Sequence, residues 1–506
     1  MRTQPATRKV DGLRALLGWI VLAASVAIVA GAWLGRGFTI DGGSMAPVLL
    51  GPHVRLECPA CQLAFDVGVE DETTVERPAT CPNCGSPVER NPAAIADGDG
   101  VLVDRGAFQF RAPRRYEVAS LCEPNRAGQL CVKRVVGLPG ERVAIRAGDV
   151  FIDGEISRKN LAEQQAVALF VYDNAFPARG DSAGPARWQP EKKASRWRAA
   201  AGGFTATSEN SGADPGADDW LTYRHLVRVG DSAEFVESPV LDTQAYNQTR
   251  PVADPHEVRD LALAMDFEAN EPGTISFRAL HPSSSSPHPD PLPPGEGESQ
   301  GGADLYCTLY VSTGQWQLRY GDRSLATGSA APLADGRTHS IYFSTFDRQI
   351  LLAIDGHLIC EHVFEETGDQ AILPDQTGDA DPARREPRPP GHSSPARPFA
   401  IASDCAALQI TGLRVLRDVY YTSVGVARMP GDSQEAAETQ LAADEFFVLS
   451  DNSRLGLDSR YASFGPIVPA NLFVGKPLAA YGRSPRAAGW WGGIQVPAVW
   501  RIRYIR

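Results

Sequence analysis

The sequence predicts a mainly β protein that follows an N-terminal transmembrane helix, and three observations lead to this fold class. Short segments typical of strands recur between residues 98 and 481. One long apolar run without charges lies near the N-terminus, and no later segment is long and apolar enough to cross a membrane. The length of 506 residues suffices for about three domains.

The composition is that of an ordinary globular protein. Hydrophobic residues make up 43% of the chain and charged residues 22%, which argues against a mostly disordered chain. The net charge of −12 leads us to expect no nucleic acid as a partner. The segment after Ser459 differs, because it is basic, lacks Asp and Glu, and contains three tryptophans. Such a tail is typical of a surface that lies against membrane lipid, and the alternative is a solvated face with a few core aromatics.

The apolar run spans Ala15–Gly35, which as a helix is about 31 Å long and matches the hydrocarbon core of a bilayer. Basic residues precede it, so the positive-inside rule places residues 1–14 in the cytoplasm and the rest on the outer side. We therefore expect a single-pass protein of the cell (inner) membrane whose main part is periplasmic. The alternative is a signal peptide cleaved after Ala30–Ala32, but its apolar region would exceed the usual length.

Four of the nine cysteines form two CxxC knuckles: Cys58, Cys61, Cys81 and Cys84. Each tight turn directs two sulfurs at one tetrahedral ion, so the spacing predicts a structural zinc ribbon over residues 57–90. Two disulfides are the alternative in an oxidising compartment. Zinc is favoured because a disulfide within CxxC closes a strained small ring. No further ligand lies between the knuckles, so we expect a structural metal with no catalytic role.

Strands are expected along the rest of the chain. A group of them in the middle of the chain, at short and even spacing, suggests a β-sandwich. The expected strands are Gly98–Val103, Leu130–Val136, Asp260–Glu268, Gly273–Leu280, Leu305–Ser312, Gln315–Tyr320, Thr338–Phe346, Gln349–Ile354, Leu358–Phe364, Ala407–Arg417 and Glu445–Leu449. Residues 161–224 are expected to be a loop-rich linker. The proline-rich segments 281–302 and 374–398 are expected to be disordered surface loops.

Candidate chemistry centres on one serine and one lysine. Ser44 follows two glycines, which permit close approach of another chain. A serine hydroxyl is a poor nucleophile without a base, and the histidines, which lie mostly in loops, form no convincing Ser/His/Asp set with it. Lys133 lies in an apolar strand-like run, and burial lowers a lysine pKa from about 10.4 by up to roughly 3–5 units. Taken alone, both residues are more often a turn serine and a strand-edge lysine.

Four segments stand out along the chain: Gly43–Pro47, Asp97–Val103, Lys133–Glu141, and Ser450–Ser453 with its continuation through Leu457–Arg460 and Phe464–Pro466 to Val474–Lys476. In this order they resemble the conserved boxes of bacterial type I signal peptidases, the membrane-bound Ser/Lys proteases that remove signal peptides. The resemblance implies a β catalytic domain with Ser44 as the nucleophile and Lys133 as the general base. It also implies that catalysis needs no cofactor.

The resemblance further implies the substrate and the supporting residues. The substrates would be secretory preproteins, whose signal peptide binds as an extended strand beside Gly42, Met45 and Val132. The residues expected to support the site belong to the last box: Asp451, Asn452, Asp458, Ser459 and Arg460, with Asp458 and Arg460 forming an ion pair.

Three positions depart from the pattern of the family. The last box usually begins Gly-Asp-Asn-Arg, whereas this chain has Ser450-Asp451-Asn452-Ser453. In some members a serine two positions before the aspartate of Asp-Ser-Arg orients the lysine, and Gly456 stands there. In some members a serine two positions before the nucleophile donates to the oxyanion, and here that residue is Gly42. The group that orients Lys133 and the second oxyanion donor are therefore open.

The middle of the chain has a resemblance of its own. Residues 333–341 and 347–356 are similar to a strand pair of laminin-G or concanavalin-like sandwiches, in which an Asp-Gly-x-x-His strand pairs with a strand ending in Ile-Asp-Gly. Such folds often bind sugars or proteins, but no convincing calcium or sugar site is present, and the ligand is unknown. The alternative is a structural cap.

These inferences give one domain order and one leading function. The expected order is a cytoplasmic tail 1–14, an anchor 15–35, catalytic core 37–56, a zinc-ribbon-like insert 57–90, catalytic core 91–160, a linker 161–224, a laminin-G/concanavalin-like insert 225–420, and catalytic core with tail 421–506. The leading function is a signal peptidase. The rival is an anchored lectin-like or protein-binding receptor on an inactive protease core, which Gly456 favours and the Ser44–Lys133 pair opposes. A self-cleaving repressor is a third reading, but the chain lacks a DNA-binding helix pair.

Overall fold

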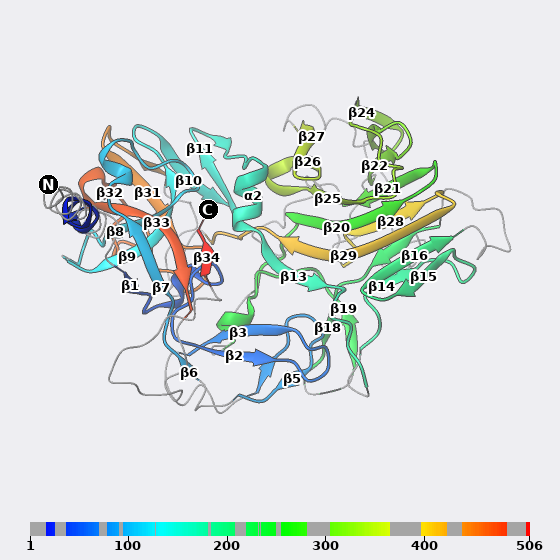
Figure 1. Cartoon of the computed structure of the whole chain (residues 1–506), viewed down its shortest axis with the longest axis horizontal. Helices are drawn as coiled ribbons and strands as arrows, with labels where there is room; N and C mark the ends of the chain where they lie inside the picture. The colour runs from blue at the N-terminus through cyan, green and yellow to red at the C-terminus, as the bar shows by residue number, and fades with distance from the viewer. Residues whose placement is uncertain are drawn as a thin grey trace, which may run out of the picture.

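The computed structural model is mainly β, as predicted, and consists of two β bodies side by side with a small ribbon below them (Figure 1). It describes residues 17–25, 37–69, 78–90, 95–126, 128–180, 184–207, 219–230, 232, 234–248, 255–280, 304–364, 396–422, 438–482 and 502–505.

The first body, which we call the core body, is built from both ends of the chain. Its main sheet, within the described residues, has the order β1-β7-β33-β8-β9-β31-β32, and β34 pairs with β33. The strands are β1 (Phe38–Thr39), β7 (Gly100–Asp104), β8 (Val118–Cys122), β9 (Leu130–Gly137), β31 (Glu445–Leu449), β32 (Val468–Pro469), β33 (Phe473–Tyr481) and β34 (Ile502–Tyr504). In the antiparallel pair β9–β31, Leu449 lies opposite Arg134. This register places the segment after β31 next to Lys133.

A second, smaller sheet extends the core body. It has the order β12-β11-β10-β30. Its strands are β10 (Arg142–Arg146), β11 (Asp149–Ile152), β12 (Glu155–Ile156) and β30 (Thr439–Gln440). After the insert, the chain returns to the core body at Tyr421, which bridges Gly148 between β10 and β11, and then adds β30 to this sheet.

The second body is a sandwich of two antiparallel sheets. Their orders, for the part of the chain that the structure describes, are β15-β16-β29-β20-β25-β26-β27, with β13 on β29, and β14-β17-β28-β21-β22-β23-β24. Side chains from both sheets share one hydrophobic cluster that includes Trp188, Phe267, Phe277 and Phe343. In β22 every second residue is buried, the pattern of a strand with one face on a core. The predicted β-sandwich is therefore present.

The bounds of the sandwich strands match most of the expected segments. They are β13 (Leu169–Asp173), β14 (Trp188–Pro190), β15 (Trp197–Ala200), β16 (Gly203–Thr207), β17 (Leu221–Tyr223), β20 (Leu261–Ala269), β21 (Thr274–Ala279), β22 (Leu305–Tyr310), β23 (Gln315–Tyr320), β24 (Arg323–Ser329), β25 (Thr338–Ser344), β26 (Gln349–Ile354), β27 (His357–Val363), β28 (Phe399–Ser403) and β29 (Ala407–Arg417). The two strands with the Asp-Gly-x-x-His and Ile-Asp-Gly motifs, β25 and β26, are paired.

The expectation of a loop-rich linker over 161–224 is wrong. This segment begins with helix α2 (Leu161–Val167), which Asn160 and Glu163 cap reciprocally. It continues with strands β13 to β17, which belong to both sheets of the sandwich. These strands are only three to five residues long. Three of them, β13, β16 and β17, pair with β28 or β29, which lie about two hundred residues later in the sequence. The segment forms strands because of this distant pairing, so its local sequence has no periodicity that would predict them.

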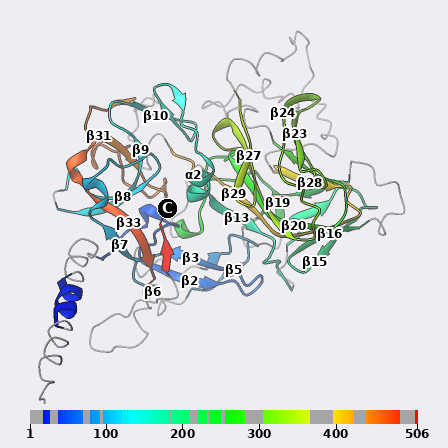
Figure 2. The same cartoon turned by 45° about the horizontal axis from the view of Figure 1, so that its top comes forward.

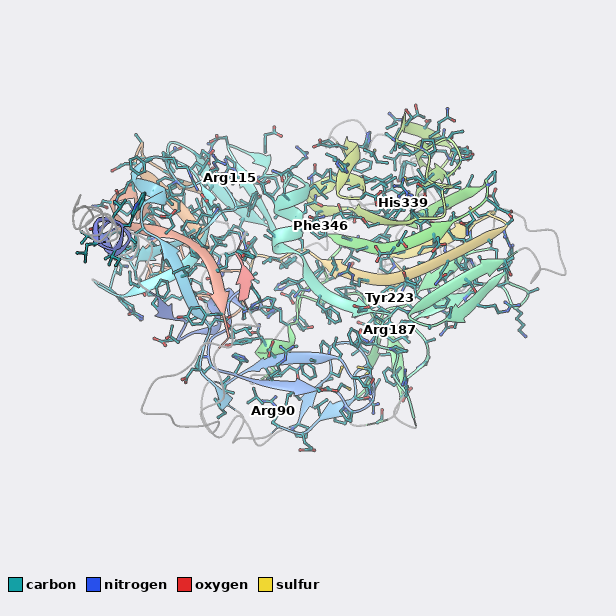
Figure 3. All side chains as sticks on the ribbon, viewed as in Figure 1. Arg90, Arg115, Arg187, Tyr223, His339 and Phe346 are labelled. Carbon is teal, nitrogen blue, oxygen red and sulfur yellow. The ribbon has the colours of Figure 1, made fainter. Side chains whose placement is uncertain are left out.

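The ribbon lies between the nucleophile segment and the sandwich. Its strands are β2 (His53–Glu57), β3 (Ala64–Gly68), β4 (Ala79–Thr80), β5 (Pro87–Val88) and β6 (Ile95–Ala96). The short hairpin of β18 (Leu226–Arg228) and β19 (Phe235–Glu237) approaches it from the insert. Figure 3 places Arg90 within the ribbon, and Arg187 and Tyr223 where the sandwich meets it.

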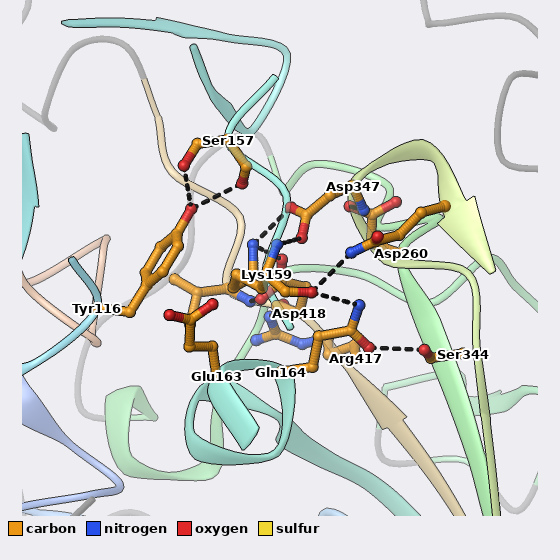
Figure 4. Close-up of polar contacts among 12 residues, drawn as sticks. Tyr116, Ser157, Lys159, Glu163, Gln164, Asp260, Ser344, Asp347, Arg417 and Asp418 are labelled. Atoms are coloured by element: carbon orange, nitrogen blue, oxygen red, sulfur yellow. Dashed lines mark hydrogen bonds and ion pairs between the residues drawn. The ribbon is translucent and has the colours of Figure 1, made fainter. Parts of the chain in front are cut away.

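A buried polar junction joins the core body to the sandwich (Figure 4). Lys159 Nζ lies 2.5 Å from Asp347 Oδ1 and 2.8 Å from Asp418 Oδ2. Beside it, the hydroxyl of Tyr116 donates to the carbonyl of Ser157 at 2.8 Å. Three carboxylates, including Asp347, come close together here. Of the three carboxylates, Asp347 pairs with the Lys159 ammonium, and burial raises the pKa of Asp149 and of Asp260 and so favours their neutral forms.

Several expectations concern residues that the structure describes only in part. Residues 17–25 form a short helix that stands away from the core body (Figure 2), whereas 15–16 and 26–35 lie outside the described residues. Within the described part of the chain, no helix combines the length and the apolar character that a membrane crossing requires. The segments 281–302 and 374–395, and the tryptophans of the C-terminal tail, also lie outside it.

Candidate active site

Ser44 lies in a short 3₁₀ turn, η1 (Gly43–Met45), just after β1, and its side chain is half-buried. Asn452 holds this turn from the other end of the chain. Its backbone N–H donates to the carbonyl of Ser44 at 2.9 Å, and its Nδ2 donates to the carbonyl of Gly43, also at 2.9 Å. The backbone N–H of Ser44 has no acceptor among the described residues, so it is available as a donor to an oxyanion.

Lys133 lies in the middle of β9 and is only 3% exposed. Its Nζ donates to the hydroxyl of Ser450 at 3.0 Å and lies 5.8 Å from the centre of the Phe464 ring. Burial lowers the pKa of Lys133 below its ordinary value, more than the nearby Cys131 and Asp458 raise it. Among the described residues no carboxylate forms an ion pair with this ammonium. The surroundings therefore favour the neutral amine that a general base requires.

The structure brings Ser44 and Lys133 to the same three-residue segment, 450–452. Asn452 binds the carbonyl of Ser44, and Ser450 binds the amine of Lys133. The flanking residues Met45 and Val132 also share one hydrophobic cluster. Within the described residues Lys133 Nζ makes its hydrogen bond to Ser450 and none to the hydroxyl of Ser44.

The other residues expected to support the site form a rigid frame around it. Arg460 forms a buried ion pair with Asp458, with Nη2 2.8 Å from Oδ2. The same carboxylate accepts from the backbone N–H of Ser450 at 2.9 Å. Asp451 forms a second buried ion pair, with Arg134 at 2.6 Å, and the hydroxyl of Ser459 accepts from the backbone of β31. The segment 450–460 is therefore fixed to the sheet by charges that water does not reach.

The three residues expected to contact substrate differ in their surroundings. The side chains of Met45 and Val132 are buried in the cluster that they share, so these side chains serve the core. Gly42 is exposed, and a Cβ added there would meet no atom within 4 Å. Of the three, Gly42 has open space for a bound chain beside it.

Two residues of the insert reach this site, and no motif in the sequence predicts either of them. Asn247 and Asn452 exchange amide hydrogen bonds of 2.8 Å and 2.7 Å. The ring of Tyr246 packs so closely on Gly43 that a Cβ at Gly43 would lie 2.3 Å from it. The glycine is thus needed for contact with the insert. These contacts join residues about two hundred positions apart, which local patterns do not reveal.

The four ribbon cysteines meet as a buried cluster. Their Sγ atoms all lie within 4.8 Å of one another, with 3.5 Å between Cys58 and Cys84 and between Cys61 and Cys81. All four are free thiols, so they form no disulfides in this structure. Four sulfurs at about 2.3 Å from a tetrahedral zinc ion would lie about 3.8 Å apart, close to these separations. The donor set and its geometry fit a structural metal.

The chain is similar to several solved structures and to one protein family. No curated protein matches. Among solved structures, the chain is similar to a protein of unknown function with a galectin-like fold from Bacillus subtilis (10% identity, TM-score 0.27, 49% of this chain and 97% of that one). It is also similar to a carbohydrate-binding module from Bacillus subtilis (8%, 0.23, 45% and 94%) and to the mouse laminin α1 domains LG4–5 (15%, 0.16, 38% and 43%).

One protein family matches a segment that covers part of the core body and extends into its two neighbours. The matched segment starts inside the ribbon, includes Lys133 and ends in the first strands of the sandwich, whereas Ser44 and residues 450–460 lie outside it. Residues 83–190 match the family described as "Signal peptidase, peptidase S26", and this match supports a relation of the chain to the signal peptidase family.

Proposed function

We propose that this protein is a membrane-anchored signal peptidase that cleaves signal peptides from secretory preproteins with Ser44 as the nucleophile and Lys133 as the general base. The observation that carries the proposal is the surroundings of Lys133. A buried lysine with no carboxylate partner costs stability, and its neutral form is a ready base. The lysine also lies within the segment that matches the signal peptidase family.

The reaction would proceed in two stages. Neutral Lys133 takes the proton of the Ser44 hydroxyl as the oxygen attacks the carbonyl carbon before the cleavage site. The backbone N–H of Ser44 is a donor for the resulting oxyanion. Lys133 then gives its proton to the leaving amine, which leaves an acyl-enzyme. In the second stage Lys133 activates the water that hydrolyses this ester.

The remaining parts of the proposal concern the setting of this chemistry. The run Ala15–Gly35 would anchor the chain with its N-terminus in the cytoplasm, so that the site faces the outer or periplasmic side. The basic and aromatic tail would lie against membrane lipid. Cys58, Cys61, Cys81 and Cys84 would hold one structural zinc ion.

The test is cleavage of a preprotein with an Ala-x-Ala site by the full-length protein in detergent or lipid. Ser44→Ala and Lys133→Ala should each abolish cleavage and leave the thermal midpoint near that of the wild type. Lys133→Arg should also be inactive, because a guanidinium does not lose its proton near neutral pH. The matched controls are Ser463→Ala and Lys193→Ala, which alter exposed residues and should cleave normally. Substantial cleavage by Ser44→Ala or Lys133→Ala would refute the assignment.

A further inference from the structure

The amine of Lys133 has one polar side-chain partner among the described residues, the hydroxyl of Ser450 at 3.0 Å. Both residues are almost fully buried, at 3% and 0% exposed. The other neighbour of Nζ is the face of the Phe464 ring, which attracts a cation but does not select one N–H direction. The direction of the Lys133 amine therefore depends on Ser450.

The room for the Ser450 side chain comes from a glycine. A Cβ added at Gly456 would lie 2.1 Å from the Cβ of Ser450 and 2.2 Å from its Oγ. Such distances are far below van der Waals contact, so positions 450 and 456 share one space. The backbone N–H of Gly456 donates to the carbonyl of Asn452 at 2.8 Å, and this turn brings the two positions together. A side chain fits at one position only when the other is glycine.

The Ser450 hydroxyl is held in place by the frame around it. Ser450 directly follows β31, which pairs with β9 through Leu449 and Arg134, next to Lys133. Its backbone N–H donates to Asp458, and the Asp458 carboxylate is fixed by Arg460. The serine therefore presents its oxygen to Lys133 from a backbone with little freedom to move.

We propose that Ser450 is a positioning residue for Lys133. Gly456 makes this role possible, because it has no side chain and leaves the space that the Ser450 side chain occupies. The hydroxyl of Ser450 accepts a hydrogen bond from one N–H of Lys133. This bond fixes the direction of the other N–H and of the lone pair on Nζ. This inference rests on the proposed function, because the positioned lysine is the base of the peptidase reaction. Ser450 is then the group that orients Lys133 in a chain whose position 456 is glycine and carries no hydroxyl.

The test compares Ser450→Ala, Ser450→Gly, Gly456→Ser and the exchanged double variant Ser450→Gly/Gly456→Ser. Misplacement of a catalytic group by about 1 Å can cost about 100-fold in rate, so Ser450→Ala should lower kcat about 10- to 100-fold with KM within about twofold. The acid limb of the pH–rate profile of Ser450→Ala should also shift. The double variant returns a hydroxyl to the same space, so its kcat should be at least about tenfold higher than that of Ser450→Gly. Ser463→Ala is the control.

Thermal midpoints supply a readout that does not depend on cleavage. Gly456→Ser alone should be destabilised by the overlap with Ser450, and the double variant should be markedly more stable than the sum of its single changes predicts. If the wild type cleaves and Ser450→Ala keeps the wild-type kcat and pH profile, the positioning role is wrong. If the single changes are additive in stability and the exchange recovers no activity, the shared space is wrong. A wild type that cleaves no preprotein refutes the proposed function, and the non-additivity still decides whether the two positions share one space.

Discussion

At the scale of single residues, Asn247 links the insert to the nucleophile turn. It exchanges two hydrogen bonds with Asn452, and Asn452 in turn binds the carbonyls of Gly43 and Ser44. Asn247→Ala would leave a buried amide without its partner, at a cost of about 1–3 kcal/mol in the free energy of unfolding. We expect this loss in urea unfolding, together with slower preprotein cleavage.

The control for this variant is Asn270→Ala, which alters an exposed asparagine of the same insert and should leave both quantities unchanged. Wild-type stability and wild-type cleavage in Asn247→Ala would show that the insert does not brace the nucleophile turn. The insert would then be a structural cap that takes no part in holding the turn.

The residues of the candidate site differ in how far the sequence reveals them. Ser44 and Lys133 could be proposed because each lies in a short local motif. The partners that hold them could not, since Ser450 is 317 positions from Lys133 and Asn247 is 205 positions from Asn452. A serine where the usual box has glycine reads as a departure in the sequence. In the structure, Ser450 lies beside Lys133 and offers it the hydroxyl that Gly456 lacks.

At the scale of elements, Glu117 ties the start of β8 to β33 and to the loop before β8. Its carboxylate lies 2.9 Å from Lys476 Nζ and 2.6 Å from Arg111 Nη2. Burial alone would raise the pKa of Glu117, but these cationic partners outweigh it and lower the pKa to about 2. Because the folded-state pKa is depressed, the stabilisation is complete above the unfolded pKa of about 4.5 and is lost as pH falls toward 2.

Glu117→Gln should therefore lower stability near neutral pH by about 1–2 kcal/mol, a value reduced for solvent screening of the partly exposed cations. The difference from the wild type should shrink as pH falls below about 4.5. Thermal midpoints between pH 3 and pH 7 measure this difference, with Glu155→Gln at an exposed position of β12 as the control. A difference that does not change with pH would contradict the electrostatic explanation.

The strands that could be predicted are those whose own sequence alternates or is strongly apolar. In β22 alternate residues are buried, and β26 is buried along its whole length. The strands β14 and β17 have only three residues each and were not predicted. A segment so short carries too little periodicity, and these two become strands because each completes a sheet begun elsewhere in the chain.

At the scale of the whole molecule, the ribbon connects the nucleophile segment to the sandwich. Asn83, between two of the cysteines, exchanges hydrogen bonds with the backbone of Asp173 and donates to the carbonyl of Phe176 at 2.8 Å. On the other side, β2 of the ribbon begins only nine residues after Ser44. The two CxxC knuckles could be predicted from their spacing, but these contacts with the insert could not.

Loss of the proposed metal should therefore loosen two parts of the molecule together. We expect one zinc ion per chain in native mass spectrometry, and a lower thermal midpoint with slower cleavage in Cys81→Ser or after treatment with a strong chelator. Cys122→Ser, outside the cluster, is the control. Metal-free protein with wild-type stability would contradict a structural zinc site.

The most direct measurement is the N-terminal sequence of the product formed when the purified full-length protein is incubated with a preprotein. The proposed function predicts one new N-terminus immediately after the Ala-x-Ala site, formed by the wild type and absent with Ser44→Ala. No product from the wild type in lipid, or the same product at the same rate from Ser44→Ala, would contradict the claim that Ser44 is the nucleophile of a signal peptidase.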